Sequence, residues 1–150
     1  MRFACLGSGS QGNSMIIEEK RTRLLLDCGF SIKEATTRLC RLGLQPDMLD
    51  GIIITHEHED HIGGVERLAR RFDVPVWLTH GTLRGATNTF STLSKINIID
   101  SHQRFSVGDI YIQPYPVPHD AHEPTQFVFG NGDLRLGVLT DTGCSTTHIE

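Results

Sequence analysis

The sequence predicts a layered α/β domain with a mixed sheet. Short apolar runs typical of strands come first, strand-like runs then alternate with segments of helical periodicity, and hairpin-like strands follow from about residue 104. The chain has 150 residues, of which 38% are hydrophobic and 21% charged. That length and composition suit one globular domain spanning residues 1–150.

The first part of the chain predicts three strands and a helix. Residues 2–7 (RFACLG) are short and apolar, and a Gly/Ser-rich turn follows at 8–13. Residues 14–19 (SMIIEE) and 22–29 (TRLLLDCG) are further strand candidates joined by a charged turn. Ser31, with Glu34 three residues later, is typical of a helix N-cap. We expect that helix to run to about Leu42 and to stop at Gly43.

Strands and helices alternate in the middle of the chain. Residues 51–55 (GIIIT) are β-branched and suit a buried strand. One amphipathic helix is predicted from Ile62 to about Phe72 because apolar residues recur there at helical spacing. Pro75 opens the next strand candidate, VWLT, and a Gly/Thr-rich stretch of helical character then precedes the strand candidate INIID.

The last part predicts two hairpins. Residues 104–117 turn at Gly108 and Asp109, and residues 126–141 turn around 130–133. The Ser and Thr residues that precede Glu150 are typical of the start of a helix rather than its end. We therefore expect the chain to be the first part of a longer protein, with the domain incomplete on its C-terminal side.

Composition limits the classes of function. The formal net charge is −4 and the pI is near 6.0, which argues against a broad basic surface for nucleic acid but allows a local one. The four cysteines are scattered, with no C-x-x-C pair, and are expected to be free thiols used in packing. The start of the chain lacks an apolar leader, and no run approaches the roughly 18 apolar residues of a membrane span. We expect a cytoplasmic protein with no membrane contact.

Residues 55–61 (THEHEDH) combine three histidines and three acids directly after a strand-like run. His56 and His58 project to one side of an extended segment, whereas Asp60 and His61 follow once the chain curls into a helix. The glycine pair at 63–64 tolerates such a curl. The alternative is a charged, solvated loop. We favour two adjacent metal positions, because imidazole and carboxylate ligands together suit zinc, and also manganese or iron.

This segment resembles the H-x-H-x-D-H motif of the metallo-β-lactamase fold hydrolases. Three further segments resemble that family's other motifs in the family's order: LLLDCG (24–29), PVPHDAHEP (116–124) and GVLTDTG (137–143). The opening LGSGSQGNS (6–14) is most similar to the YycJ/WalJ-like branch of bacterial hydrolases. The resemblance covers essentially the whole chain and implies a metallo-β-lactamase-like αββα sandwich with mixed sheets.

The resemblance also implies a ligand set. It assigns His56, His58 and His119 to one metal. Asp60 and His61 go to a second metal, and Asp141 bridges both. Asp27 would orient a ligating histidine without binding metal itself.

The family's second metal takes a further histidine from well beyond the TDTG segment. His148 follows Asp141 too closely to match it, so we expect the second site to be incomplete in this chain. His122 lies near His119 and could compete with it as a ligand, but the family pattern favours His119.

These features predict a dinuclear metal-dependent hydrolase that uses a metal-activated hydroxide, with Asp60 orienting or deprotonating the water. The cofactors would be two divalent ions, zinc first and Mn²⁺ or Fe²⁺ as alternatives. His58 stands where diiron redox relatives carry glutamate, which favours hydrolysis.

The branch resemblance suggests a phosphodiester substrate, such as nucleic acid. Arg67, Arg70 and Arg71 could meet phosphates or could form a solvated helix face. The alternatives are a thioester or lactone hydrolase of the same fold and a metal-binding module that has lost catalysis. No oligomeric state follows from the sequence.

Overall fold

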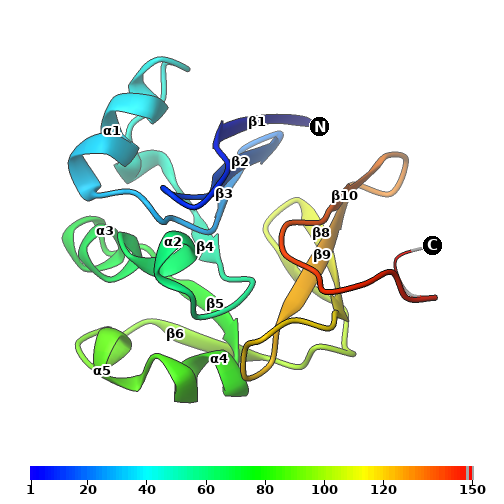
Figure 1. Ribbon diagram of the computed structural model, residues 1–150. Helices are drawn as coiled ribbons and strands as arrows, with labels where there is room; N and C mark the ends of the chain where they lie inside the picture. Colours follow the sequence, from blue (N-terminus) through cyan, green and yellow to red (C-terminus); the bar gives the residue numbers. More distant parts are fainter. Residues whose placement is uncertain (148, 150) are drawn as a thin grey trace.

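Two β-sheets pack face to face in the computed structural model, which describes residues 1–147 and 149 (Figure 1). The first sheet has six strands in chain order: β1 (Arg2–Gly7), β2 (Ser14–Glu19), β3 (Thr22–Leu26), β4 (Gly51–Ile53), β5 (Val76–Thr79) and β6 (Ile96–Ile99). The second sheet has the order β10-β9-β8-β7 and consists of β7 (Phe105–Val107), β8 (Ile110–Pro116), β9 (Thr125–Gly130) and β10 (Arg135–Val138).

The first sheet is mixed and the second is antiparallel. β1, β2 and β3 pair as antiparallel neighbours, whereas β3 to β6 run parallel. Parallel neighbours need crossover connections, which helices supply here. α1 (Ile32–Cys40) and the short 3₁₀ helix η1 (Pro46–Met48) connect β3 to β4, and α4 (His80–Gly85) and α5 (Thr87–Phe90) connect β5 to β6. The resemblance implied mixed sheets, and this holds only for the first.

Two apolar cores follow from the alternation of side chains along the central strands. Leu24 and Leu26 of β3 face the second sheet and pack with Phe127 and Phe129, whereas Leu25 between them faces the helices. Ile52 and Ile54 likewise face the helices, and Ile53 faces the second sheet. β3 and β4 are buried on both faces, which explains their continuous apolar sequences.

The N-terminal half of the helical layer follows the sequence patterns, with one correction. Ser31 caps α1 by accepting a hydrogen bond from the backbone N–H of Glu34 at 3.3 Å, and the helix ends at Cys40 rather than near Leu42. The single helix predicted from Ile62 to about Phe72 is correct only from Val65 onward. Two helices, α2 (Glu59–Ile62) and α3 (Val65–Phe72), stand there instead, separated by the glycine pair at 63–64.

Gly64 explains the break between α2 and α3. A Cβ on this residue would lie 1.8 Å from the carbonyl oxygen of Phe30, so only glycine allows the backbone to pass so close to the segment after β3. This approach brings residues 59–64 against residues 27–30, where several of the predicted site residues lie.

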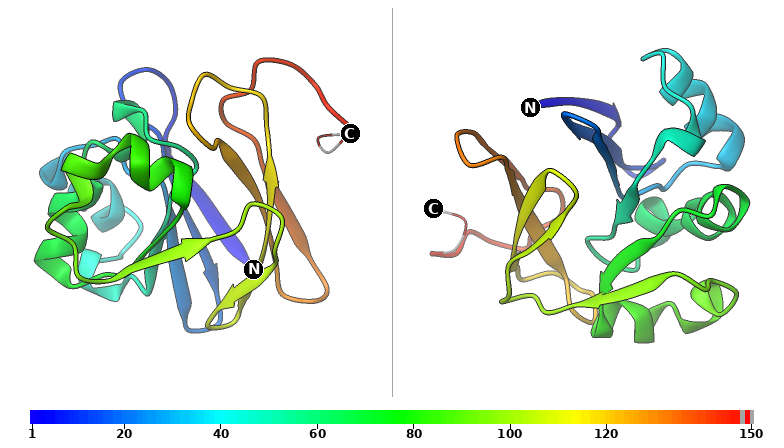
Figure 2. Two further views of the ribbon diagram at one scale, coloured as in Figure 1. Left: turned by 90° about the horizontal axis from the view of Figure 1, so that it is seen from below. Right: turned by 180° about the vertical axis from the view of Figure 1, so that it is seen from behind.

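All the helices of the described residues lie on the outer side of the first sheet (Figure 2). The outer face of the second sheet carries no helix among residues 1–147 and 149 (Figures 1 and 2). The helix start predicted near the C-terminus falls partly on His148 and Glu150, which lie outside the described residues. Within the described part of the chain, no helix has the length and apolar character needed to cross a bilayer.

Candidate metal centre

The predicted site residues lie at the ends of strands, where the two sheets meet. Asp27 directly follows β3, and residues 54–58 follow β4, so both segments leave the carboxyl ends of neighbouring parallel strands. His119 belongs to the connection between β8 and β9, and Asp141 follows β10 (Figure 1). The first sheet therefore supplies one wall of the site and the second sheet the other.

Two groups of side chains are close enough to hold a metal ion. In each group the potential ligand atoms lie within 4.8 Å of one another. The first group is His56, His58 and His119, and the second is His56, His61 and Asp141. Asp60 belongs to neither group, but its Oδ2 lies 3.6 Å from Nε2 of His61.

The protonation of His61 is set by Asp27. Asp27 is buried, and its Oδ2 lies 2.8 Å from Nδ1 of His61. A carboxylate can only accept a hydrogen bond, so Nδ1 donates to Asp27 and Nε2 is the ring atom that could bind a cation. Two more donors fix the carboxylate itself, because Oδ1 accepts from the Thr55 backbone N–H at 2.8 Å and Oδ2 accepts from the Thr55 hydroxyl at 2.7 Å.

The same reasoning applies to His58 and His119. Nε2 of His58 faces the carbonyl oxygen of Asp120 at 3.2 Å, and Nδ1 of His119 faces the Asp120 carboxylate at 3.1 Å. Both partners are acceptors, so these two ring nitrogens can donate to them. Nδ1 of His58 and Nε2 of His119 are then the ring atoms available to an ion.

His56 is held from the opposite side of its ring. Its Nδ1 lies 3.0 Å from the Thr55 hydroxyl, which already donates its proton to Asp27 and can accept here. Nε2 of His56 is buried and has no hydrogen-bond partner. Each of the four histidines thus directs one ring nitrogen toward the same region.

This arrangement fits a divalent cation. Nδ1 of His58 and Nε2 of His119 lie 3.2 Å apart. Two nitrogens bound to one tetrahedral zinc ion at about 2.0–2.1 Å are separated by roughly 3.3 Å. Nε2 of His61 and Oδ2 of Asp141 are 2.7 Å apart, so a negatively charged oxygen faces the second group of nitrogens. Nitrogen and oxygen donors of this kind suit Zn²⁺, Mn²⁺ or Fe²⁺.

Burial and charge shape the titration of two of these rings. Burial, together with the charge of the neighbouring His61, lowers the pKa of His56 to about 4, so the ring is neutral at pH 7. Burial also disfavours the charged form of His61. Its pKa is nevertheless raised, because it hydrogen-bonds Asp27 and lies near the charges of Asp27, Asp60 and Asp141.

Asn13 connects the N-terminal turn to the site. Its backbone N–H donates to the Asp60 carbonyl oxygen at 2.7 Å, and its side-chain Nδ2 donates to Oδ2 of Asp60 at 3.0 Å. Its Oδ1 accepts from the Gly9 N–H at 2.9 Å, which closes the turn. From the sequence, residues 10–13 are expected to lie near substrate. The structure places Asn13 against Asp60.

Two residues at the site, Thr55 and Glu57, had no predicted role. Thr55 links Asp27 to His56, and the sequence signal is a polar residue that closes a buried strand just before the histidines. Glu57 and His122 contact each other at 2.6 Å between Oε1 and Nδ1. His122 therefore lies outside both ligand groups, and His119 takes the place in the first group.

The arginines considered as phosphate contacts, and two further histidines, lie outside the two ligand groups. Arg67, Arg70 and Arg71 are exposed on α3, and Arg70 pairs with Glu66 one turn earlier at 3.3 Å. That pairing is typical of a solvated helix face. His80 and His102 are exposed as well.

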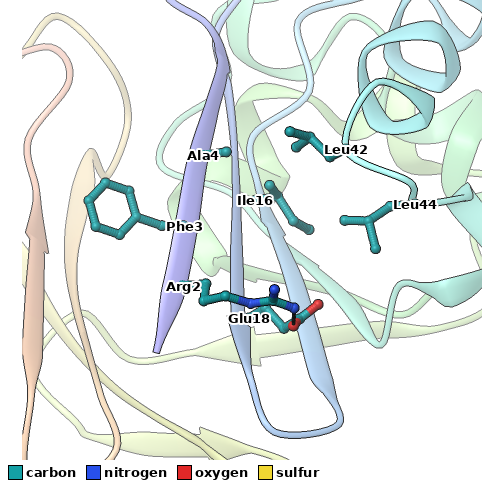
Figure 3. Close-up of a pocket in the computed structure, with 7 residues that line it drawn as sticks. All are labelled: Arg2, Phe3, Ala4, Ile16, Glu18, Leu42 and Leu44. Atoms are coloured by element: carbon teal, nitrogen blue, oxygen red, sulfur yellow. Dashed lines mark hydrogen bonds and ion pairs between the residues drawn. The ribbon is translucent and has the colours of Figure 1, made fainter.

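Two hollows lie on different sides of the first sheet. One, of about 350 Å³, adjoins Asp60 and Asp141 and has the turn residues Ser8, Gly9 and Ser10 on its rim. The other lies on the helix side of β1 and β2, where Ile16, Leu42 and Leu44 converge beside the ion pair of Arg2 with Glu18 (Figure 3). Only the first hollow adjoins ligand atoms, so it is the candidate substrate site.

The family follows from comparison with known sequences. A family model described as the metallo-beta-lactamase superfamily matches residues 7–150. The chain belongs to this superfamily. The resemblance inferred from the four motifs is thereby confirmed.

Curated members of the metallo-beta-lactamase superfamily include similar proteins. Exodeoxyribonuclease WalJ of Streptococcus pneumoniae serotype 2 is 37% identical over 147 residues, which cover 95% of this chain and 54% of WalJ. Exodeoxyribonuclease YycJ of Bacillus anthracis is 34% identical over 149 residues, covering 95% of this chain and 55% of YycJ. These matches confirm the predicted YycJ/WalJ-like branch. The chain spans about half the length of these relatives.

Solved structures of the superfamily share the fold. The Rm3 metallo-beta-lactamase superposes with a TM-score of 0.72 at 17% identity, covering 98% of this chain and 65% of that one. The metallo-beta-lactamase fold protein YhfI from Bacillus subtilis also gives a TM-score of 0.72, at 18% identity, covering 89% of this chain and 59% of that one. The predicted fold class is confirmed.

Proposed function

We propose that this chain carries the metal centre of a dinuclear metal-dependent phosphodiesterase that acts on DNA. The observation that carries the proposal is the convergence of four histidine rings and the Asp141 carboxylate at one edge of the sheets. The names of the two exodeoxyribonuclease relatives support a nucleic-acid substrate.

The ligands divide between two positions. His56, His58 and His119 would hold the first ion. Asp60 and His61 would hold the second, and the Asp60 carboxylate needs only a small side-chain movement because it lies 3.6 Å from Nε2 of His61. Asp141 would contact both ions, since its Oδ2 lies 2.7 Å from Nε2 of His61 and 3.9 Å from Nε2 of His56.

The reaction would combine ion chemistry with one carboxylate of the chain. When bound, two divalent ions, zinc in the first place and manganese or iron as alternatives, polarise the phosphodiester and lower the pKa of water toward about 7. Asp60 would orient the attacking water and accept its proton, because its carboxylate is partly exposed beside the substrate hollow. The Asn13 amide holds that carboxylate in place.

The substrate hollow offers polar groups but no cation. Ser8 and Ser10 supply hydroxyl groups, and Asp60 and Asp141 supply negative charge. A phosphodiester would therefore depend on the bound ions for its electrostatic attraction. For that reason we expect metal removal to abolish substrate binding as well as turnover.

Activity on matched substrates tests the proposal. Protein loaded with Zn²⁺ or Mn²⁺ is expected to hydrolyse bis-p-nitrophenyl phosphate and to shorten an end-labelled DNA oligonucleotide. His119→Ala should lose both activities, whereas His102→Ala, an exposed histidine outside the ligand groups, should keep them. Hydrolysis of an acyl thioester or lactone alone would favour the acyl-hydrolase alternative. Bound metal without turnover of any of these substrates would identify a metal-binding module.

A further inference from the structure

Glu57 stands between the first two histidines of the motif but points away from both ligand groups. Its Oε1 accepts a hydrogen bond from the His122 backbone N–H at 2.8 Å and lies 2.6 Å from Nδ1 of the His122 ring. The Glu57 side chain is 10% exposed, and its Oε2 is buried with no hydrogen-bond partner. A solvated acid of a surface loop would not be held in this way.

The partner of Glu57 lies on the loop that carries His119, here called the His119 loop (residues 117–124). The Val117 N–H donates to the Pro124 carbonyl oxygen at 3.2 Å and closes the base of this loop. The Ala121 N–H donates to the carbonyl oxygen of His119 at 2.9 Å, so the backbone between His119 and His122 is a tight turn. A constraint on His122 is therefore transmitted over a short, hydrogen-bonded path to His119.

Helix α4 packs against the His119 loop at two glycines, Gly81 and Gly85, which lie one turn apart. A Cβ on Gly81 would lie 2.4 Å from Cβ of Glu123, and a Cβ on Gly85 would lie 2.7 Å from Nδ1 of His122 and 2.8 Å from Cδ of Glu57. The Gly81 N–H also donates to Oε2 of Glu123 at 2.8 Å. The loop and Glu57 thus fill space that only glycine leaves open.

We infer that Glu57 is a positioning residue that fixes the third histidine of the first metal site. The first site needs His119, which comes from the second sheet, to meet His56 and His58, which come from the first. Glu57 lies between His56 and His58 in the sequence and contacts His122 of the His119 loop through hydrogen bonds. One short segment therefore supplies two ligands and also determines where the remaining ligand stands.

The inference rests on the proposed metal centre, and it makes a distinct prediction about geometry. Groups that orient ligands typically change metal affinity by about 10- to 100-fold when removed. Glu57→Ala should lower the affinity for the first ion by such a factor, because both hydrogen bonds to His122 are lost. Glu57→Gln should stay within about threefold of the unmodified protein, since the amide oxygen can still accept both bonds.

Glu59→Ala and Glu59→Gln are the matched controls. Glu59 is an exposed acid one residue beyond His58, whereas Glu57 is one residue before it, so both substitutions remove the same charge from the same segment. A purely electrostatic role would make Glu57→Gln and Glu59→Gln equally harmful. A positioning role predicts that only Glu57→Ala loses affinity for the first ion.

Competition of Zn²⁺ with a chromophoric chelator measures the two binding constants, and the visible absorption bands of the Co²⁺-loaded protein report the geometry at the ions. Thermal denaturation of the metal-free variants shows whether they fold. If the unmodified protein bound no ion, the proposed function would fail. If it bound ions and Glu57→Ala bound them equally with an unchanged Co²⁺ spectrum, the present inference would be overturned.

A second variant covers the case in which Glu57→Ala does not fold. Gly85→Ala leaves Glu57 and His122 intact but pushes a methyl group into their contact. Gly85→Ala should lower the affinity for the first ion in the same way. Gly137→Ala should leave this affinity unchanged, because an added Cβ there meets nothing within 4 Å. Equal affinity of both alanine variants for the first ion would contradict the inference.

Discussion

The Asp27 carboxylate accepts a hydrogen bond from Nδ1 of His61 at 2.8 Å, across 34 positions of sequence. Asp27 adopts a left-handed backbone conformation, with φ at 54°, at the end of β3. This conformation is uncommon outside glycine, asparagine and aspartate. The strained backbone turns the carboxylate into the site, where it also accepts both hydrogen bonds from Thr55.

Asp27→Asn is expected to lower the affinity for the second ion about 10- to 100-fold. It should also lower the free energy of unfolding of the metal-free protein by about 1–3 kcal/mol. Asparagine tolerates the same backbone, but its NH₂ group cannot accept the bonds that one carboxylate oxygen accepts now. Chelator competition and urea denaturation would measure the two effects.

Asp73→Asn is the control for that experiment. Asp73 also has a left-handed φ, at 57°, but it ends α3 on the surface and pairs there with the exposed Lys95. Its replacement should change the free energy of unfolding by less than about 0.5 kcal/mol. Equal losses in both variants would mean that backbone strain, rather than the contact with His61, makes Asp27 important.

His56→Ala should remove the first ion and nearly all turnover, because His56 is one of the three ligands assigned to that ion. His58→Ala should affect the first ion more than the second, since His58 belongs only to the first group. Elemental analysis of protein dialysed against a fixed free Zn²⁺ concentration would count the ions per chain. Full occupancy in His56→Ala would contradict the ligand assignment.

Gly29→Ala should destabilise the fold by about 3 kcal/mol or more, because the added Cβ would lie 1.8 Å from the carbonyl oxygen of Asp60. The clash would force residues 60–64 away from residues 27–29, so metal affinity should fall as well. Thermal denaturation and chelator competition are the measurements.

Gly137→Ala is the matched case on the opposite sheet. Gly137 lies in β10, and an added Cβ there meets nothing within 4 Å. Alanine should be neutral or slightly stabilising, since glycine weakens a strand interior. A loss of stability in Gly137→Ala as large as that in Gly29→Ala would show that the steric explanation is wrong.

The cysteines should differ sharply in reactivity. Burial raises the pKa of the Cys28 thiol to about 12, so it stays protonated and shielded at pH 8. Cys5, Cys40 and Cys144 are exposed, contrary to the expectation that all four cysteines serve in packing. Mass spectrometry after alkylation of the native protein should find three labelled cysteines. Rapid labelling of Cys28 would contradict its burial, and denatured protein should label at all four.

The sequence was sufficient to predict the fold class, the succession of strands along the chain and the N-cap of α1. Apolar runs such as 51–55 and alternating hairpin strands are local patterns, and local backbone preference follows from them. The break between α2 and α3 was missed because it depends on the close approach of Gly64 to Phe30, a contact between distant segments. The spacing of apolar residues within one segment does not reveal a contact with a distant segment.

The site divides in the same way. Residues 56, 58, 60 and 61 stood out by their spacing and residue types, whereas His119, Asp141 and Asp27 entered only through resemblance to a family. The sequence alone determined which side chains carry ligand chemistry. Only the tertiary structure decided which ring nitrogens face the candidate metal positions, and that Glu57 holds His122 instead of facing these positions. The physical reason is that hydrogen-bond partners from separate strands and loops set the protonation and orientation of each ring, and folding alone brings those partners together.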